Sequence, residues 1–242
     1  MTMDNSGYVA LSHQMVLQRQ MEVIAHNIAN ANTGAYKSDT TLFETFLMDG
    51  GNNKKIAYVQ DFGVLINFRE GQLESTGNQL DLAIQGPGFL VAQTANGVAY
   101  TRAGHLTVNQ RGELSTEQGD AILDENRRPI IVADPALGNV MINPDGTVAV
   151  DDARPVRLLM VEFDNPQQLR RRGAGYFVTD APERPSAGTR VIQGMIERSN
   201  VEPVLELAAM IETSRAYQHS NKLMETEHEL QRKMADRLPQ LR

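Results

Sequence analysis

The spacing of apolar residues changes twice along this chain, from a helical period to an alternating one and back again. From about Asn5 to Asn30, the residues Leu17, Met21, Ile24 and Ile28 recur every three or four positions, which places them on one stripe of a helix. A second helical pattern runs from about Glu202 to Leu238. We therefore expect a helix at each end of the chain and a different architecture between them.

The middle of the chain alternates apolar and polar residues, as half-buried strands do. The alternating pairs are Leu82/Ile84, Phe89/Val91, Val98/Tyr100, Leu106/Val108 and Val148/Val150. Turn residues separate these pairs, in the stretches Gly86-Pro87-Gly88, Asn96-Gly97, 109–112 and 143–146. Short strands at this spacing predict an antiparallel meander or barrel. The predicted fold class is α+β, with the terminal helices pairing as a coiled-coil-like domain beside a central antiparallel β-rich domain.

Three parts follow from this pattern: a terminal helical assembly domain (1–35 with 199–242), a connecting extended or loop segment (36–80) and the β-rich domain (81–198).

The C-terminal helix carries a short apolar stripe and then a seven-residue rhythm with polar residues interleaved, which is too polar for a strong isolated helix pair. The stripe is Val204, Leu207 and Ile211, and the rhythm is Ala216, Leu223, Leu230 and Met234, with Ser220 and Glu227 between them. Helices gain stability mostly by packing a face. We therefore expect the two ends of the chain to lie together and to pack on neighbouring copies.

The N-terminal helix ends in the stretch AHNIANANTGAYKSD, from Ala25 to Asp39, which contains three asparagines. Asparagine tolerates the left-handed conformation that closes many helices, and glycine adopts it at little cost. The sequence therefore predicts a helix end here, with Gly34 in the left-handed conformation.

Composition excludes several classes of protein. Of 242 residues, 41% are hydrophobic and 22% are charged, as in a globular chain. The net charge of −7 argues against a protein that coats nucleic acid. The absence of cysteine excludes disulfides and thiolate sites. No apolar stretch is long enough to span a bilayer, and the N-terminus lacks the pattern of a cleaved secretory signal.

No group of residues predicts catalysis, a cofactor or a metal site. The five histidines lack metal-ligand spacing, and the stretch GPGF lacks the GK[ST] of a phosphate loop. The run Arg170-Arg171-Arg172 is expected to be a solvated basic turn. The alternative from another class is a β-rich hydrolase or carbohydrate-binding domain that uses Asp81 or Asp151-Asp152, which would need a paired carboxylate in an open groove.

Three stretches resemble motifs of the bacterial flagellar rod and hook proteins. The first is AHNIANANTGAYKSD, although the family places its glycine directly before the aromatic residue, where this chain has Ala35. The second runs from Thr76 to Leu114 and contains TGNQLDLAIQGPGF and YTRAG. The third runs from Glu197 to Thr226 and contains ERSNVEPVLELAAMIETSRAY. They occur in the family's order and cover most of the chain.

The resemblance implies a structural subunit of the flagellar basal-body rod, without catalysis. The modest length of the middle favours a rod protein over a hook protein. Among rod proteins the chain resembles a proximal-rod member most, with a distal-rod member as the alternative. Family resemblance further implies a periplasmic helical tube built from copies of this chain and other rod proteins. It also implies delivery by the flagellar type III export apparatus without a cleaved signal, and no membrane insertion or nucleic-acid binding.

The resemblance also implies which residues act in assembly and export. The implied assembly residues are Asn27, Asn30, Asn32, Thr33, Lys37, Asn200, Ile211, Tyr217, Leu223 and Leu230. Phe43 and Leu47, in the stretch FETFL, are similar to a short element that early export substrates present to the export gate.

Overall fold

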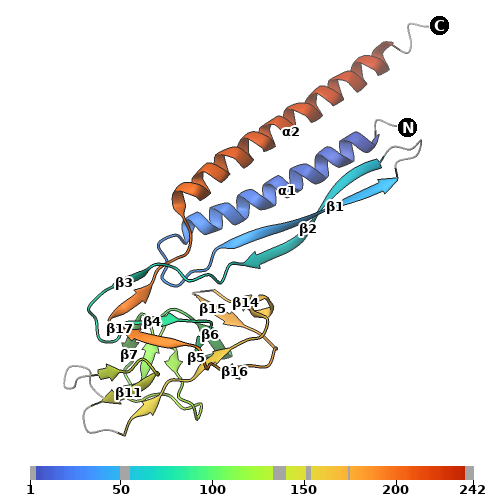
Figure 1. The fold of residues 1–242 in the computed structure, drawn as a ribbon. Coiled ribbons are helices and arrows are strands. Elements are labelled where there is room, and N and C mark those ends of the chain that lie inside the picture. The colour runs from blue at the N-terminus through green and yellow to red at the C-terminus, as the bar shows by residue number, and fades with distance from the viewer. Residues whose placement is uncertain (1–3, 50–54, 133–139, 151–153, 174, 238–242) are drawn as a thin grey trace. The chain divides into compact units, whose positions relative to one another are not determined.

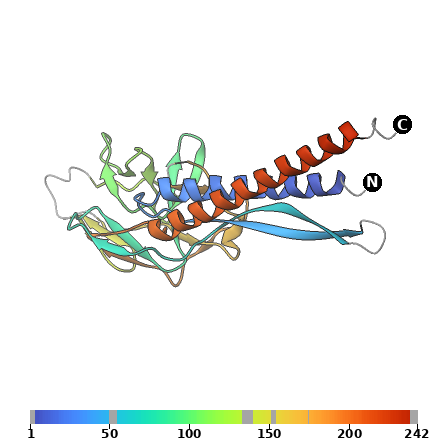
Figure 2. The same ribbon diagram turned by 90° about the horizontal axis from the view of Figure 1, so that it is seen from above.

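The computed structural model describes residues 4–49, 55–132, 140–150, 154–173 and 175–237 (Figures 1 and 2). The chain forms two compact units and passes between them four times. Unit 1 consists of Met1–Ala29, Asp39–Asn67 and Glu202–Arg242, and unit 2 consists of Asn30–Ser38 and Phe68–Val201. Both ends of the chain therefore belong to unit 1.

Unit 1 contains two helices and one β-hairpin. They are α1 (Asp4–Ala29), β1 (Asp39–Asp49), β2 (Lys55–Ile66) and α2 (Pro203–Arg237). Helix α1 contacts α2 on one side and the hairpin on the other (Figure 1). Its predicted stripe is inward, since Leu17 and Ile24 are buried and Met21 and Ile28 are half-buried. The two predicted helices are confirmed.

The hairpin lies in the segment for which only an extended connection was expected. Its strands pair from Asp39 opposite Ile66 to Asp49 opposite Lys55. The register shifts between Leu42 and Phe43, where β2 carries one extra residue. Such a bulge interrupts the two-residue period along a strand. This interruption explains why alternation did not reveal the pairing.

Helices α1 and α2 run antiparallel and lie side by side, and two hydrogen bonds near opposite ends of the contact fix their register (Figure 2). The Asn27 amide donates to Glu206 at 3.1 Å, and Gln14 donates to Asn221. The side of α2 that is buried carries polar residues, Thr213 and Ser220. Met210, Tyr217 and Met224 lie on the same side and are half-buried. Six other apolar residues are exposed by 52–78% of their surface, namely Val204, Leu205, Leu207, Ile211, Leu223 and Leu230. Helix α2 therefore has a buried seam of mixed polar and apolar residues and further apolar residues on its exposed side.

Unit 2 is built from short strands, and every strand pairing that the structure describes is antiparallel. The strands are β3 (Leu73–Ser75), β4 (Leu82–Gln85), β5 (Phe89–Thr94), β6 (Gly97–Thr101), β7 (Leu106–Val108), β8 (Leu114–Thr116), β9 (Ala121–Ile122), β10 (Val140–Ile142), β11 (Thr147–Val150), β12 (Val156–Arg157), β13 (Met160–Glu162), β14 (Arg170–Arg171), β15 (Tyr176–Val178), β16 (Arg184–Pro185), β17 (Arg190–Gln193) and β18 (Met195–Glu197), with a short 3-10 helix η1 (Pro166–Gln168). The prediction of an α+β fold with a β-rich core is confirmed.

The largest sheet follows the order β14-β15-β6-β5-β9-β8-β7, and β13 pairs with β5 beside β9. Its core consists of side chains that are at most 2% exposed, among them Leu82, Ile84, Leu90, Leu106, Leu114, Ile122 and Leu158. The predicted hairpin forms between β5 and β6, where Thr94 pairs with Gly97. Gly97 has a φ of 102°, which explains the glycine after Asn96.

In the part of the chain that the structure describes, no helix combines the length and apolarity needed to cross a bilayer.

Candidate functional site

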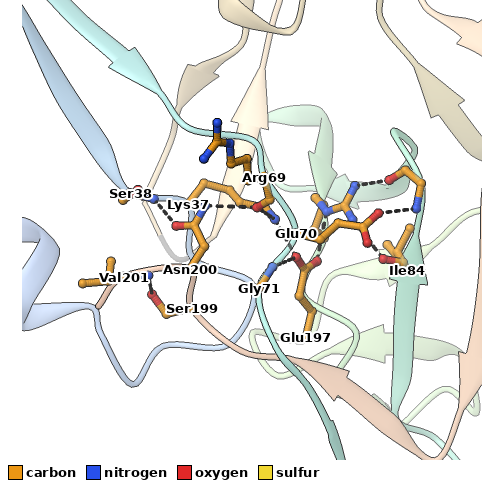
Figure 3. Close-up of polar contacts among 12 residues, drawn as sticks. Lys37, Ser38, Arg69, Glu70, Gly71, Ile84, Glu197, Ser199, Asn200 and Val201 are labelled. Carbon is orange, nitrogen blue, oxygen red and sulfur yellow. Dashed lines mark hydrogen bonds and ion pairs between the residues drawn. The ribbon is translucent and has the colours of Figure 1, made fainter. Parts of the chain in front are cut away.

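A buried ion-pair cluster in unit 2 joins one charged residue from each of the three sequence motifs. Lys37 comes from the N-terminal motif and Glu197 from the C-terminal motif (Figure 3), and Arg102 comes from the central motif. The Lys37 Nζ atom lies 2.5 Å from Glu197 Oε1, and Arg102 Nε lies 3.0 Å from Glu197 Oε2. All three side chains are at most 3% exposed. We call these three residues the buried triad.

Arg102 connects the triad to the turn between β4 and β5. Its guanidinium donates to the carbonyl oxygens of Ile84 at 2.9 Å, Gly86 at 2.7 Å and Gly88 at 2.9 Å. A guanidinium is suited to this position because its donors form a fixed planar fork. The predicted Gly86-Pro87-Gly88 turn is therefore held from inside the unit.

Glu197 is the centre of the triad because both of its carboxylate oxygens accept bonds. Besides the two cations, Gly71 N–H donates to Glu197 Oε1 at 2.8 Å. A side chain at Gly71 is impossible in this arrangement, since a Cβ atom would lie 2.0 Å from the carbonyl oxygen of Arg198. Glycine thus allows the backbone to approach the buried carboxylate closely.

Lys37 makes a second bond, from its ammonium to the Arg69 carbonyl oxygen at 2.9 Å. Burial lowers the pKa of Lys37 below its ordinary value of 10.5, and the Glu197 carboxylate partly offsets that effect. Buried charges are tolerated when they are paired and hydrogen-bonded. The triad meets this condition, and its three side chains are shielded from solvent. It therefore serves to hold the three motifs together and not to react with a substrate.

Near the triad, backbone hydrogen bonds join the N-terminal motif to the C-terminal motif. Ala35 N–H donates to the Glu197 carbonyl at 2.8 Å, and Asn200 N–H donates to the Tyr36 carbonyl at 3.2 Å. The Asn200 side chain accepts from Ser38 N–H at 2.6 Å and donates to the Arg69 carbonyl at 3.0 Å (Figure 3). The predicted site residues Lys37 and Asn200 are thus brought together within unit 2.

The turn before Tyr36 differs from the prediction. The expectation that Gly34 takes the left-handed conformation was wrong, because Ala35 takes it instead, with a φ of 54°. This is the position at which the resembled family has its glycine. Ala35 is 5% exposed, and its N–H bond to Glu197 holds the backbone there. A Cβ atom in this conformation costs free energy that a glycine would not.

Arg171 also belongs to this region, which corrects the prediction of a solvated basic turn. Its guanidinium donates to the Lys37 carbonyl at 2.6 Å and lies 4.4 Å from the centre of the Tyr36 ring. Strand β14 pairs with β15, and this pairing holds Arg171 in place. The N-terminal motif is therefore covered by a cation–π contact as well as by the triad.

In unit 1, Asn27 is the asparagine that the structure buries, at 2% exposure. Its amide accepts from Asp39 N–H and donates to the Asp39 carbonyl, each at 2.9 Å, while also donating to Glu206. One side chain therefore connects the end of α1, the start of β1 and the start of α2. The burial of Glu206 raises the pKa of its carboxyl group, and the Asn27 hydrogen bond partly offsets that rise.

The other predicted site residues lie at more exposed positions. Asn32 and Thr33 are exposed in the turn after α1, where Thr33 N–H donates to the Asn30 carbonyl at 3.1 Å. On α2, Tyr217 is half-buried, whereas Ile211, Leu223 and Leu230 are exposed. Phe43 is half-buried in β1, and the side chain of Leu47 lies outside the described residues. Their roles in assembly and export stay predictions.

Sequence reasoning did not select Arg102 and Glu197 as site residues, although both stood within the quoted motifs. Each is a charged residue at the end of a strand whose other residues are largely apolar or uncharged, in YTRAG and in MIERS. Because a charge at a buried strand end needs a partner, that placement could have indicated an ion pair. Nothing in the spacing indicated which partner each would take.

The alternative catalytic residues have structural contacts. Asp81 is 2% exposed and accepts from Thr76 at 2.5 Å and Asn78 at 3.1 Å, while His105 Nδ1 lies 2.6 Å from it. Asp151-Asp152 lies outside the described residues. Among the described residues, no group of three or more His, Cys, Asp or Glu side chains could hold a metal ion.

Comparison with known families gives three matches along the chain, all to flagellar rod or hook proteins. Residues 8–37 match the family described as flagella basal body rod protein. Residues 83–150 match the flagellar hook protein FlgE/F/G D1 domain, and residues 192–237 match the flagellar basal body rod FlgEFG protein C-terminal family. Each match contains one member of the triad.

Similar full-length proteins agree with these matches. The chain is 38% identical to the flagellar basal-body rod protein FlgF of Caulobacter vibrioides, over 98% of each chain. It is 33% identical to FlgF of Mesorhizobium japonicum, over 92% of each chain. FlgG of Bacillus subtilis is 29% identical, over 93% of this chain and 96% of that protein. The chain belongs to the flagellar basal-body rod protein family and is a structural subunit, not an enzyme.

Proposed function

We propose that this chain is a proximal-rod subunit whose terminal helices pair as a coiled-coil-like domain and bundle with those of neighbouring subunits. In this proposal the neighbours are copies of the same chain and other rod proteins. Together they form a helical tube in the periplasm that transmits torque and encloses the export channel. The buried triad and Asn27 act within the subunit by positioning the segments that join the helices to the rest of the chain.

The exposed apolar side of α2 is the observation that carries this proposal. Val204 is 78% exposed and Leu223 is 59% exposed, on a helix whose two fully buried positions among the described residues, Thr213 and Ser220, are polar. Fully burying one such side chain contributes about 1.5–3 kcal/mol. A helix with this distribution buries little apolar surface within its own subunit and much more when another subunit covers it. Contacts between different patches of successive copies generate open helical assemblies.

The proximal-rod assignment rests on relatives of both types. The FlgF proteins of Caulobacter and Mesorhizobium are 38% and 33% identical to the chain, whereas FlgG of Buchnera aphidicola and FlgG of Bacillus subtilis are 31% and 29% identical. FlgF of Salmonella typhimurium is also 29% identical. The two highest of these identities support a proximal position, and a distal position is the competing assignment. Delivery by the type III export apparatus without a cleaved signal is part of the same proposal, with Phe43 and Leu47 in the proposed gate element.

The test is Leu223→Asp, which places a charge on the exposed apolar side of α2 without removing a buried contact. We expect loss of rod assembly and motility, with unchanged circular dichroism of the purified chain. The matched control is His228→Asp, which adds the same charge at an exposed polar position of the same helix and should leave motility intact. A motile Leu223→Asp strain would contradict the packing role of α2.

A further inference from the structure

We infer that residues 197–201, here called the closing segment, complete unit 2 last and order the N-terminal motif only when they reach it. In a chain that lacks these contacts, the contacts of Arg171 with Tyr36 and Lys37 alone do not fix residues 35–38. The inference concerns the order in which one subunit becomes structured. It goes beyond the proposed role in assembly.

Hydrogen bonds of the N-terminal motif supply the first argument. Ala35 N–H and Ser38 N–H both donate to the closing segment, at 2.8 Å to the Glu197 carbonyl and at 2.6 Å to the Asn200 side chain. The Tyr36 carbonyl accepts from Asn200 N–H. The closing segment thus provides partners for three backbone groups within residues 35–38, and buried backbone groups need such partners.

Charge supplies the second argument. Lys37 and Arg102 are buried cations of the same unit, and Arg102 lowers the pKa of Lys37. Until Glu197 arrives, burying both would place two like charges in a site of low dielectric constant. Arg102 has three other carbonyl partners, Ile84, Gly86 and Gly88, whereas the Lys37 ammonium binds the Arg69 carbonyl and Glu197. Lys37 therefore depends most on the closing segment.

Sequence separation supplies the third argument. Lys37 and Glu197 are 160 residues apart, and Arg102 and Glu197 are 95 apart. The β5–β6 hairpin, in contrast, closes between Thr94 and Gly97. Local hairpins form within microseconds, whereas contacts between distant residues must first overcome the entropy of closing a long loop. The closing segment is thus expected to join a partly formed sheet.

The contacts of the closing segment also affect assembly, and this consequence depends on the proposed function. Helix α1 ends one residue before unit 2 begins, and α2 begins two residues after it ends. A subunit in which residue 197 and those after it have not yet arrived therefore has no fixed N-terminal motif beside α1 to offer a neighbour. Premature incorporation of incomplete chains is disfavoured by the same contacts that complete the fold.

The experiment is pulsed hydrogen exchange during refolding of the purified full chain from urea, read by peptide mass spectrometry. We expect peptides covering 35–38 and 69–72 to become protected in the same kinetic phase as peptides covering 195–201. Peptides of the β5–β6 hairpin should become protected at least about tenfold earlier. Protection of 35–38 before 195–201, or of all these segments in one phase, would overturn the inference.

A pair of variants tests the same inference in the folded protein. Glu197→Gln and Asn200→Ala should each accelerate exchange of the Ala35 and Ser38 amides at least about tenfold more than exchange in β5–β6, which reports any loss of global stability. The matched control is Glu113→Gln, which removes a carboxylate that accepts from Asn109 in the β7–β8 turn, outside both compared segments. Equal acceleration across the whole unit, or none at 35–38, would overturn the inference. Both exchange experiments use the monomer, so their outcomes do not depend on whether the proposed rod function is correct.

Discussion

The ammonium of Lys37 lies 2.5 Å from the carboxylate of Glu197, although 160 residues separate them in the sequence. Because Arg102 binds the other carboxylate oxygen, one anion pairs with two buried cations. The three residues are therefore not equivalent. Removing the anion leaves two unpaired charges, whereas removing one cation leaves an ion pair.

Glu197→Gln should consequently be the more damaging of two substitutions in the triad. We expect it to lower the free energy of unfolding by about 3–5 kcal/mol, the usual cost of breaking a buried ion pair from one side. Lys37→Met should cost less, about 1–3 kcal/mol, because Arg102 still compensates Glu197. Urea unfolding of the purified chain, followed by circular dichroism, measures both. A larger loss for Lys37→Met would mean that Glu197 is not the centre of the cluster.

Replacing the asparagines of the N-terminal motif should lower the free energy of unfolding by amounts that follow their burial. Asn27→Ala leaves both backbone groups of Asp39 without the partner that they share, which is expected to cost about 1–3 kcal/mol. Asn32→Ala removes an exposed side chain and should stay within about 0.5 kcal/mol. Thermal unfolding monitored by helical ellipticity distinguishes them. If Asn32→Ala nevertheless abolishes motility while its stability is unchanged, its predicted role between subunits gains direct support.

Ala35→Gly should stabilise the protein. The φ of 54° at Ala35 costs roughly 1–2 kcal/mol for a residue with a Cβ atom, while the greater freedom of glycine in the unfolded chain removes part of that gain. The expected net increase in the free energy of unfolding is about 0.5–1 kcal/mol. Ala103→Gly provides the control, since Ala103 lies in unit 2 without a positive φ and should be destabilised by the same change. Destabilisation at both positions would contradict strain at Ala35.

Glu206 should make the helix pair less stable as pH rises. Burial raises the pKa of its carboxyl group above the ordinary 4.5, so the folded chain binds that proton more tightly than the unfolded chain. The resulting stabilisation is full below pH 4.5 and is lost as pH rises through the folded pKa. Glu206→Gln keeps an oxygen that can accept from Asn27 and should be more stable than the wild type at pH 7.

The measurement is the difference in melting temperature between Glu206→Gln and the wild type from pH 3.5 to pH 7. We expect it to grow with pH, and the comparison cancels the titration of other carboxylates that the two proteins share. A difference that is constant across this range would show that the carboxyl group titrates normally.

The sequence predicted the elements better than it predicted the contacts between them. The helical stripe through Leu17 and Ile24 and the turn at Gly97 depend on local periodicity and backbone conformation, and both are confirmed. The β1–β2 hairpin was missed because a bulge interrupts its alternation. The exposure of Leu223 could not be predicted, because a seven-residue rhythm does not say which half of it faces the partner helix within the subunit.

The buried triad shows a different limit. Lys37 was selected through a motif resemblance and was expected to act between subunits, and nothing in its local sequence indicated burial. Selecting Glu197 as its partner requires knowing that strands β17 and β18 return to β4 and β3, which only the three-dimensional pairing reveals. Local rules identify which residues are unusual, whereas the topology decides what they contact.

The bond between Asn200 and the Tyr36 carbonyl also has an entropic consequence for the two helices. With unit 2 folded, α1 and α2 are held by two short connections instead of being the ends of one long flexible loop. Closing a loop of that length freely would cost on the order of 5 kcal/mol. Folding of the β-rich unit therefore raises the effective concentration of each helix for the other, and a weakly apolar seam can pair where two separate peptides of the same sequence would not.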